Sequence, residues 1–296
     1  YKQVIGPNWY SLDIGKVHYV VMDDIVYDNS PAGARNYFVR FARHQLDYLK
    51  KDLLKVHPET PVVVFSHSPL LLTAGAGYST PRFESYADIY DFVDCFDGFQ
   101  EVHFISGHTH VNHNVTIRPG FYEHNMAASS GSTWLCEENT GTRAHICRDG
   151  VIGGYQIWDA VGSKLSWVHK SLHRTIEDGQ FHFVDLNLVP VENRGTDLQN
   201  MVLLNVYNWD DSWEICVFEE GRQLDITQVY RTDPIYKLAF PQQVSSQTTP
   251  AATDHVFHIR TSASDTDLEF KITDRFGKVY SRKMFRPYEY ILKNYE

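Results

Sequence analysis

The chain has 296 residues, of which 43% are hydrophobic and 14% aromatic, and its formal net charge is −10 at pH 7. This length allows one large domain or two ordinary ones, and the composition is that of a packed globular protein, not a disordered one. The negative charge argues against a nucleic-acid groove, which would need a basic face, and no apolar run is long enough to be a transmembrane segment.

The first part of the chain alternates strands and helices. Apolar runs predict strands at 9–14, 17–22, 61–65 and 102–105, and helical spacing of apolar residues predicts helices at 38–56 and 86–96. The segments 27–36 and 70–85 carry loop-forming residues, and the second is long enough to lie over a site as a flap. This order predicts a layered α/β domain.

The later part of the chain reads as β structure. Strands are predicted at 114–118, 121–127, 154–159 and 164–169, and no helix is predicted after Gln180. Short alternating strands with turn residues between them then predict a β-sandwich, at 181–188, 201–207, 213–219, 226–230, 255–261, 268–274 and 279–285. We therefore divide the chain into residues 1–175, an α/β domain, and residues 176–296, an all-β sandwich.

Histidines lie directly after two of the predicted strands. His67 comes after the apolar run 61–65, and His108 and His110 come after the run 102–105 and the residues Ser106-Gly107. Open α/β sheets place ligands at the carboxyl ends of their strands, and imidazole is the commonest metal ligand in proteins. An isolated histidine is more often a hydrogen-bonded loop residue, but three at two strand ends predict a metal site.

Other candidates are weaker. His113 is interpreted as structural or as a support for the metal ligands, because a metallo-β-lactamase-like signature would need an aspartate before it and residues 111 and 112 are Val and Asn. His124 is in the alternating stretch 121–126 and is expected to be partly buried and hydrogen-bonded. Asp23 and Asp24 end a strand, and neighbouring strand residues point to opposite faces, so turn formation explains them better than one shared ion. The four cysteines form no C-x-x-C pair, and free thiols are favoured over a disulfide between Cys136 and Cys147.

Two motifs together resemble a known family. The F-S-H-S-P motif at 65–69 and the S-G-H-T-H motif at 106–110 resemble the last two sequence blocks of the calcineurin-like metallophosphoesterases. Residues 6–11 and 45–49 resemble the segment that comes after the asparagine-histidine block in that family. Residues 205–210 and 273–280 resemble the C-terminal β-domain of a subgroup of bacterial phosphohydrolases.

The resemblance implies a fold and an activity. It implies an incomplete layered α/β/β/α metallophosphoesterase domain followed by the sandwich, and a phosphatase or phosphodiesterase acting on a small phosphate ester. The family uses two divalent metal ions (Mn, Fe or Zn). Carried onto this sequence, His67 and His108 would bind one ion and His110 the other. The resemblance also implies export to the periplasm or outside of the cell.

The sequence departs from the family in its remaining ligand motifs. No glycine is followed by Asp or Asn, and no Asp-x-His occurs, so the family's D-x-H, G-D-x-x-D and G-N-H-[DE] blocks are absent. In the family these blocks, and the general-acid histidine, lie N-terminal to where this sequence starts at Tyr1, so we expect a processed or excised piece. We assign no catalytic residue, expect an incomplete or empty metal site, and predict activity only for the complete polypeptide.

Two further expectations arise from the missing blocks. The sheet would lack its first strands, and the bare apolar surface predicts a homodimer that covers it. The alternative to an enzyme is a non-catalytic glycan- or protein-binding module with vestigial histidines. The predicted flap at 70–85 and the loops at 128–150 are expected to line the pocket in either case.

Overall fold

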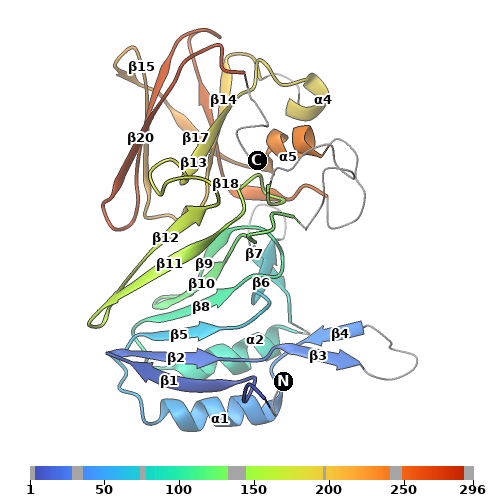
Figure 1. Ribbon diagram of the computed structural model, residues 1–296, viewed down its shortest axis with the longest axis vertical. Coiled ribbons are helices and arrows are strands. Elements are labelled where there is room, and N and C mark those ends of the chain that lie inside the picture. The colour runs from blue at the N-terminus through green and yellow to red at the C-terminus, as the bar shows by residue number, and fades with distance from the viewer. Residues whose placement is uncertain are drawn as a thin grey trace. The chain divides into compact units, whose positions relative to one another are not determined.

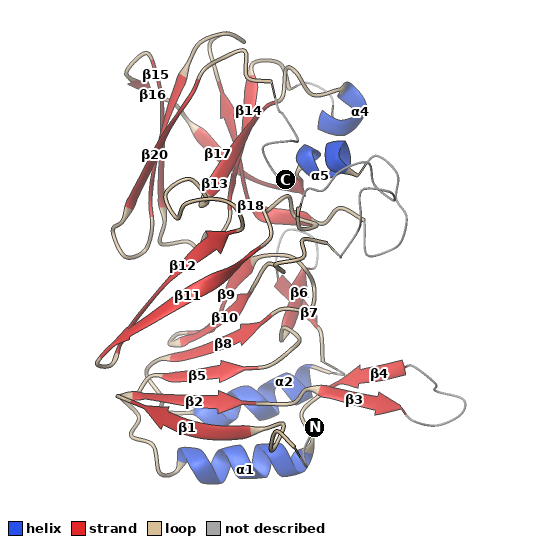
Figure 2. Ribbon diagram, viewed as in Figure 1, coloured by secondary structure: helices blue, strands red, loops and turns tan. Residues whose placement is uncertain are grey.

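The computed structural model describes residues 4–28, 36–73, 78–83, 85–132, 145–195, 198–240 and 249–289. Its regular structure is mostly strands, in several sheets with few helices (Figure 2). The chain forms two compact units. Unit 1 consists of Tyr1–Thr109, Asn114–Met126 and Trp158–Ser166, and unit 2 consists of His110–His113, Ala127–Ile157 and Trp167–Glu296. The chain therefore passes between the units several times. The division into two domains with a single boundary after residue 175, predicted from the sequence, stays a prediction.

The centre of unit 1 is a six-stranded sheet with the order β1-β2-β5-β8-β10-β9 (Figure 1). β2, β5, β8 and β10 are parallel, and β1 is antiparallel to β2. The strands lie close to their predicted positions: β1 (Tyr10–Ile14), β2 (Val17–Val21), β5 (Val62–Phe65), β8 (Val102–Ser106), β9 (His113–Arg118) and β10 (Phe121–Asn125).

Two helices cover one face of this sheet (Figure 1). They are α1 (Arg43–Leu53) and α2 (Tyr86–Val93), and a 3₁₀ turn at Asp94–Phe96 continues α2. Leu49 and Phe92 from the helices pack with Val64 and Phe104 from the sheet in one buried cluster. Ser85 caps α2 by accepting a hydrogen bond from the Asp88 backbone N–H at 3.2 Å. These helices confirm the helical spacing, although α1 begins at residue 43 and not at 38.

The opposite face of the sheet has its own smaller cluster. Val17, Val63 and Ile105 are buried there with Trp158 and Leu165 packed against them. The last two side chains come from a hairpin of β11 (Gly154–Val161) and β12 (Lys164–Ser171), which includes the strands predicted at 154–159 and 164–169. Because alternate strand residues point to opposite faces, β5 and β8 contribute to both clusters.

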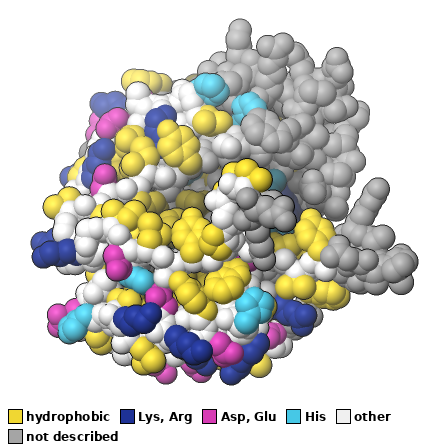
Figure 3. All heavy atoms as spheres, turned by 60° about the horizontal axis from the view of Figure 1, so that its bottom comes forward, with side chains coloured by type: hydrophobic (Ala, Val, Ile, Leu, Met, Phe, Trp, Pro, Cys, Tyr) yellow, Lys and Arg dark blue, Asp and Glu magenta, His cyan; other side chains and the backbone are white. Residues whose placement is uncertain are grey.

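The edge strand β1 exposes three large apolar side chains. Tyr10, Leu12 and Ile14 are 41%, 41% and 59% exposed, and their alternate positions put them on one face of the strand. Hydrophobic side chains gather across the middle of the face drawn in Figure 3. Contiguous apolar surface of this kind is uncommon on monomeric proteins.

Two predicted loops contain strands. The segment 27–36 includes the ends of β3 (Ile25–Asp28) and β4 (Asn36–Val39), which pair antiparallel. The flap at 70–85 includes β6 (Leu71–Thr73) and β7 (Tyr78–Pro81), which also pair antiparallel. Both loop predictions were wrong where these strands lie, because three- and four-residue strands are too short to show clear alternation.

Unit 2 contains two four-stranded antiparallel sheets, ordered β13-β14-β18-β17 and β16-β15-β19-β20. Phe183 and Ile259 from the first sheet and Val217 and Phe270 from the second share one buried cluster. The Phe183 and Phe270 rings stack with centroids 4.9 Å apart. The strands are β13 (Phe181–Asp185), β14 (Met201–Val206), β15 (Glu214–Glu219), β16 (Arg222–Gln223), β17 (Ile226–Thr232), β18 (Ala252–Arg260), β19 (Leu268–Thr273) and β20 (Val279–Met284).

Unit 2 also has two short helices, so the prediction of no helix after Gln180 was wrong. They are α4 (Val191–Arg194) and α5 (Pro234–Ala239). Elements of four and six residues are too short to establish an apolar period. The sequence did carry one signal for α5, because Asp233 caps the helix and Pro234 opens it.

Asp233 is also the centre of a buried polar network in unit 2. Its Oδ2 atom accepts hydrogen bonds from His182 Nε2 and Asn205 Nδ2, each at 2.8 Å. Asn205 Oδ1 lies 2.9 Å from His255 Nδ1, and His182 Nδ1 lies 2.8 Å from the Tyr207 hydroxyl. Burial raises the pKa of Asp233, but His182, Asn205 and the Ile235 N–H together bring that pKa below its usual value.

Cys95, Cys147 and Cys216 are free thiols, as predicted, and burial raises the pKa of Cys147. Cys136, the alternative partner of Cys147, lies outside the described residues. Among the helices that the structure describes, none is long and apolar enough to cross a membrane.

We predict that Arg286→Met destabilises unit 2 by about 3–5 kcal/mol, because it leaves the Asp185 carboxylate buried without a counter-charge. Arg286 Nε lies 3.0 Å from Asp185 Oδ2, and both side chains are 0% exposed. Urea unfolding measures the loss. The exposed pair Lys283–Glu269 provides the control, and Lys283→Met should leave the unfolding free energy close to that of the wild type.

We also predict that stability falls as the pH is lowered from 6.5 towards 4. Burial lowers the pKa of His169 from 6.5 to about 4, so within this interval the unfolded chain binds a proton that the folded chain excludes. His169→Gln should remove part of this dependence in urea unfolding across the interval. His173→Gln, at an exposed position of the same unit, should keep it; an unchanged profile for both variants would contradict the assignment.

Candidate functional site

The loops after β5 and β8 bring two of the predicted histidines together. His67 Nε2 lies 2.9 Å from His108 Nδ1, and the ring centroids are 4.8 Å apart with the rings nearly perpendicular. β5 and β8 are adjacent and parallel, so their carboxyl ends meet at one edge of the sheet. The sequence prediction that these strand ends deliver histidine to one place holds for His67 and His108.

Asp24 holds the loop that carries His67. Its buried carboxylate accepts hydrogen bonds from the backbone N–H groups of Ser68 at 2.7 Å and His67 at 3.3 Å. Burial raises the pKa of Asp24, although these hydrogen bonds act in the opposite direction. The sequence predicted turn formation for Asp23 and Asp24. This prediction fits Asp23, whose Oδ1 accepts a hydrogen bond from the Ile25 N–H, but it did not include the role of Asp24 in holding the His67 loop.

Glu123 holds the next part of the same loop. This fully buried side chain on β10 accepts hydrogen bonds from the backbone N–H groups of Leu70 at 2.7 Å and Leu71 at 3.3 Å. Asp24 and Glu123 thus fix four N–H groups of one short segment. The signal for Glu123 was present in the sequence, because its carboxylate alternates with Phe121 on the inward side of a strand.

The loop that carries His108 is fixed by side chains from β8 and β10. Asn125 Nδ2 donates to Thr109 Oγ1 at 2.5 Å, and Ser106 Oγ donates to Asn125 Oδ1 at 3.1 Å. His108 has a φ of 70°, in the left-handed region that non-glycine residues rarely adopt. Strained backbone held by surrounding hydrogen bonds is a common property of functional sites.

Arg82 and Tyr37 complete the surroundings of His108. Arg82 Nη2 lies 3.0 Å from His108 Nε2 and 3.3 Å from the Tyr37 hydroxyl, which itself lies 3.2 Å from His108 Nε2. A guanidinium can only donate, so His108 Nε2 accepts from Arg82 and its Nδ1–H faces the lone pair of His67 Nε2. The sequence predicted a flap at 70–85 over the site. It did not predict a role for Arg82, because no local sequence pattern marks this residue.

His110 belongs to unit 2. Its φ is 56°, and its Nδ1–H donates to the Ser132 carbonyl. This hydrogen bond leaves Nε2 with its lone pair, as in many metal-ligating histidines. The position of His110 relative to His67 and His108 stays a prediction.

The described residues contain no group of three or more His, Cys, Asp or Glu side chains that could hold a metal ion. His67 and His108 supply two imidazole nitrogens, whereas catalytic zinc usually has three protein ligands. These residues therefore do not fit a two-ion centre by themselves. Residues 133–144 of the predicted pocket loops lie outside the described residues.

The other two histidines are buried. His124 Nδ1 lies 2.6 Å from Asn114 Oδ1, and its Nε2 lies 2.9 Å from His103 Nδ1. His113 opens β9 and is 5% exposed. The interpretation of His113 as structural or as a support for the metal ligands stays a prediction.

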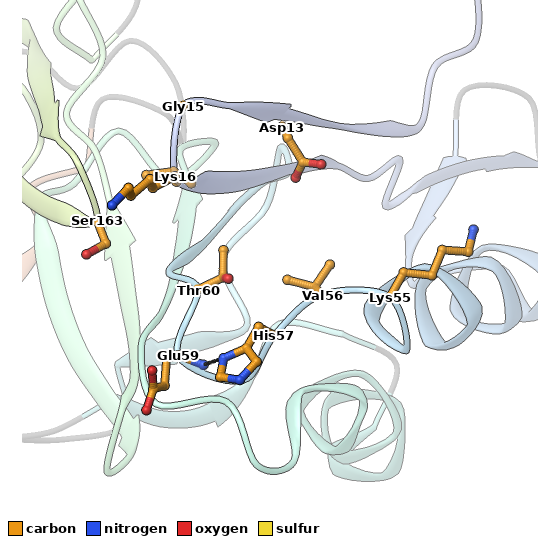
Figure 4. A pocket seen from close by; sticks show the side chains of 10 residues that line it. Asp13, Gly15, Lys16, Lys55, Val56, His57, Glu59, Thr60 and Ser163 are labelled. Atoms are coloured by element: carbon orange, nitrogen blue, oxygen red, sulfur yellow. Dashed lines mark hydrogen bonds between the residues drawn. The ribbon is translucent and has the colours of Figure 1, made fainter.

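A separate pocket of about 490 Å³ lies at the other end of β5 (Figure 4). Its lining includes two cations, Lys16 and Lys55, and two carboxylates, Asp13 and Glu59. Thr60, which precedes β5, also lines it, whereas His67 follows that strand. This pocket contains none of the predicted site residues.

Comparison with known families identifies the chain. A family described as the C terminal of calcineurin-like phosphoesterase matches residues 123–280, from β10 into β20, and this match confirms the resemblance seen in the sequence. His67, His108 and His110 precede the matched segment. A search among curated proteins finds no match. Because the match spans more than half of the 296 residues, the chain belongs to the family of calcineurin-like phosphoesterase C-terminal regions.

Proposed function

We propose that the complete polypeptide is a phosphoric ester hydrolase, a phosphatase or phosphodiesterase. The observation that carries this proposal is the convergence of His67 and His108 at the carboxyl edge of a parallel sheet. Family membership supports it, since calcineurin-like phosphoesterases generally use divalent metals. In this proposal unit 1 is part of a layered α/β metallophosphoesterase domain, and the protein acts outside the cytoplasm.

Each residue of the site has a proposed role. Two divalent ions (Mn, Fe or Zn) would supply an activated water and neutralise phosphoryl oxygens. His67 and His108 would hold one ion and His110 the other, with the remaining ligands supplied by other parts of the complete polypeptide. Arg82 would bind a phosphoryl oxygen of the substrate, because its guanidinium is beside the histidine pair and makes no ion pair within the described chain.

We predict that the complete polypeptide with added Mn²⁺ hydrolyses p-nitrophenyl phosphate or its bis ester, and that residues 1–296 alone show essentially no turnover. His67→Ala and His108→Ala in the complete polypeptide should lower kcat by at least about 10²-fold, because each removes a metal ligand. His57→Ala, at an exposed position beyond α1, is the matched control and should keep the activity.

Metal analysis of the same samples supports the assay. The complete polypeptide should retain divalent metal, and both histidine variants should retain less. Robust turnover by residues 1–296 alone would contradict the prediction that these residues are inactive by themselves. Absence of metal and of activity from the complete polypeptide, together with glycan binding, would favour the non-catalytic alternative.

We further propose that residues 1–296 form a homodimer through the exposed face of β1. In a twofold interface the same apolar patch meets its own copy, which would bury Tyr10, Leu12 and Ile14. Light scattering should show a dimer for the wild type and a monomer for Leu12→Arg. Leu54→Arg, at an 86% exposed position outside this strand, should remain dimeric. A monomeric wild type would rule the dimer out.

A further inference from the structure

Unit 2 contains a pocket that no part of the proposed phosphoesterase site uses. It has a volume of about 400 Å³ and lies where α4, the end of β17, α5 and β18 come together. Arg194, Arg231 and Lys237 line it with the carboxylate of Glu192, so its charged side chains carry a net charge of two positive. This local charge is opposite in sign to the net charge of the whole chain.

Within the described residues, the three cations of this pocket are only partly balanced, by the one carboxylate of Glu192 in the lining. No ion pair involves Arg194, Arg231 or Lys237 in the described part of the chain, and the hydrogen bonds of the two arginines go to neutral acceptors. A cation that is partly desolvated without a counter-charge is costly. Burial accordingly lowers the pKa of Arg231, although Asp233 acts in the opposite direction.

Arg231 is held in a fixed orientation. Its Nε donates to the Thr232 carbonyl at 3.2 Å, its Nη2 to the Arg194 carbonyl at 2.9 Å, and its Nη1 to His258 Nε2 at 3.1 Å. Burial, with Arg231 and Arg260 nearby, lowers the pKa of His258 to about 4, so its ring is neutral near pH 7 and can accept this hydrogen bond. Each terminal nitrogen of Arg231 still has a second N–H to offer.

Arg194 has a donor that no described group of the protein uses. Its Nη1 donates to the Leu186 carbonyl at 2.8 Å, but its Nε is buried and has no hydrogen-bond partner among the described residues. Buried donors without a partner are rare in folded proteins, because each costs about 1–3 kcal/mol. An oxygen atom of a bound anion would satisfy this N–H.

We propose that this pocket binds a doubly charged oxyanion of the phosphate class, inorganic phosphate or a phosphate monoester, through Arg194, Arg231 and Lys237. Arginine recognises such anions with paired N–H groups, and lysine adds a point charge. A dianion matches the net charge of the pocket, whereas an apolar ligand would leave three cations desolvated. The inference concerns binding alone and does not depend on the proposed hydrolysis.

Isothermal titration of residues 1–296 with inorganic phosphate tests the proposal, with glycerol 3-phosphate as a second titrant. We expect one site per chain and a melting temperature that rises with phosphate concentration. Lys237→Gln should weaken binding by about threefold or more, and Arg231→Gln by about tenfold or more. Tighter binding of glycerol 3-phosphate than of phosphate would identify a monoester as the ligand, and the reverse would identify the free ion.

Three controls keep the result specific. Lys271→Gln removes one positive charge from an exposed position on β19 of the same unit and should bind phosphate as the wild type does. Lys51→Gln, which removes a positive charge from an exposed position on α1 in unit 1, should also retain this binding. Because Arg231 also anchors the backbone, Lys237→Gln decides the outcome if Arg231→Gln does not fold. Equal phosphate affinity of the wild type and Lys237→Gln would overturn the proposal. So would a melting temperature that rises as much with sodium chloride as with phosphate.

Discussion

The parallel pairing of β5 and β8 is the constraint on which the candidate site depends. Parallel neighbours end at the same edge of a sheet, so the loop after one strand is brought within reach of the loop after the other. Here the two loops deliver His67 and His108 to hydrogen-bond distance of each other. The buried Val64 and Phe104 make this pairing stable, because the register that joins them also buries them.

The sequence was sufficient to predict the elements with a strong apolar pattern. The four parallel strands and both helices of unit 1 are long enough, or apolar enough, to be read from their residues, and so is the strand end that carries His67. The short strands β3, β4, β6 and β7 were missed, because three or four residues cannot establish a period of two. The positions of His67, His108 and His110 after two strands predicted a metal site from the residues alone. The family motifs added the assignment of these ligands to two ions.

Other parts of the site depend on contacts between residues far apart in the chain. Asp24 supports a loop more than forty residues away, and Arg82 reaches His108 from a hairpin predicted as loop. In unit 2, Arg194 and Arg231 are separated by 37 positions and come from a four-residue helix and a strand. No pattern in a single sequence predicts such pairs, because the two residues come together only in the folded chain.

Two carboxylates from different parts of the sheet hold the loop that carries His67, so the conformation of this loop depends on correct assembly of the sheet. Asp24 follows β2 and Glu123 lies within β10, which is two strands beyond β5 on the other side. A slip of either strand by one residue would move its carboxylate by about 3.3 Å along the sheet and withdraw it from the N–H groups it accepts. The geometry around His67 can therefore form only after strands on both sides of β5 have reached their native register. A sheet with either strand out of register would lack this arrangement of His67.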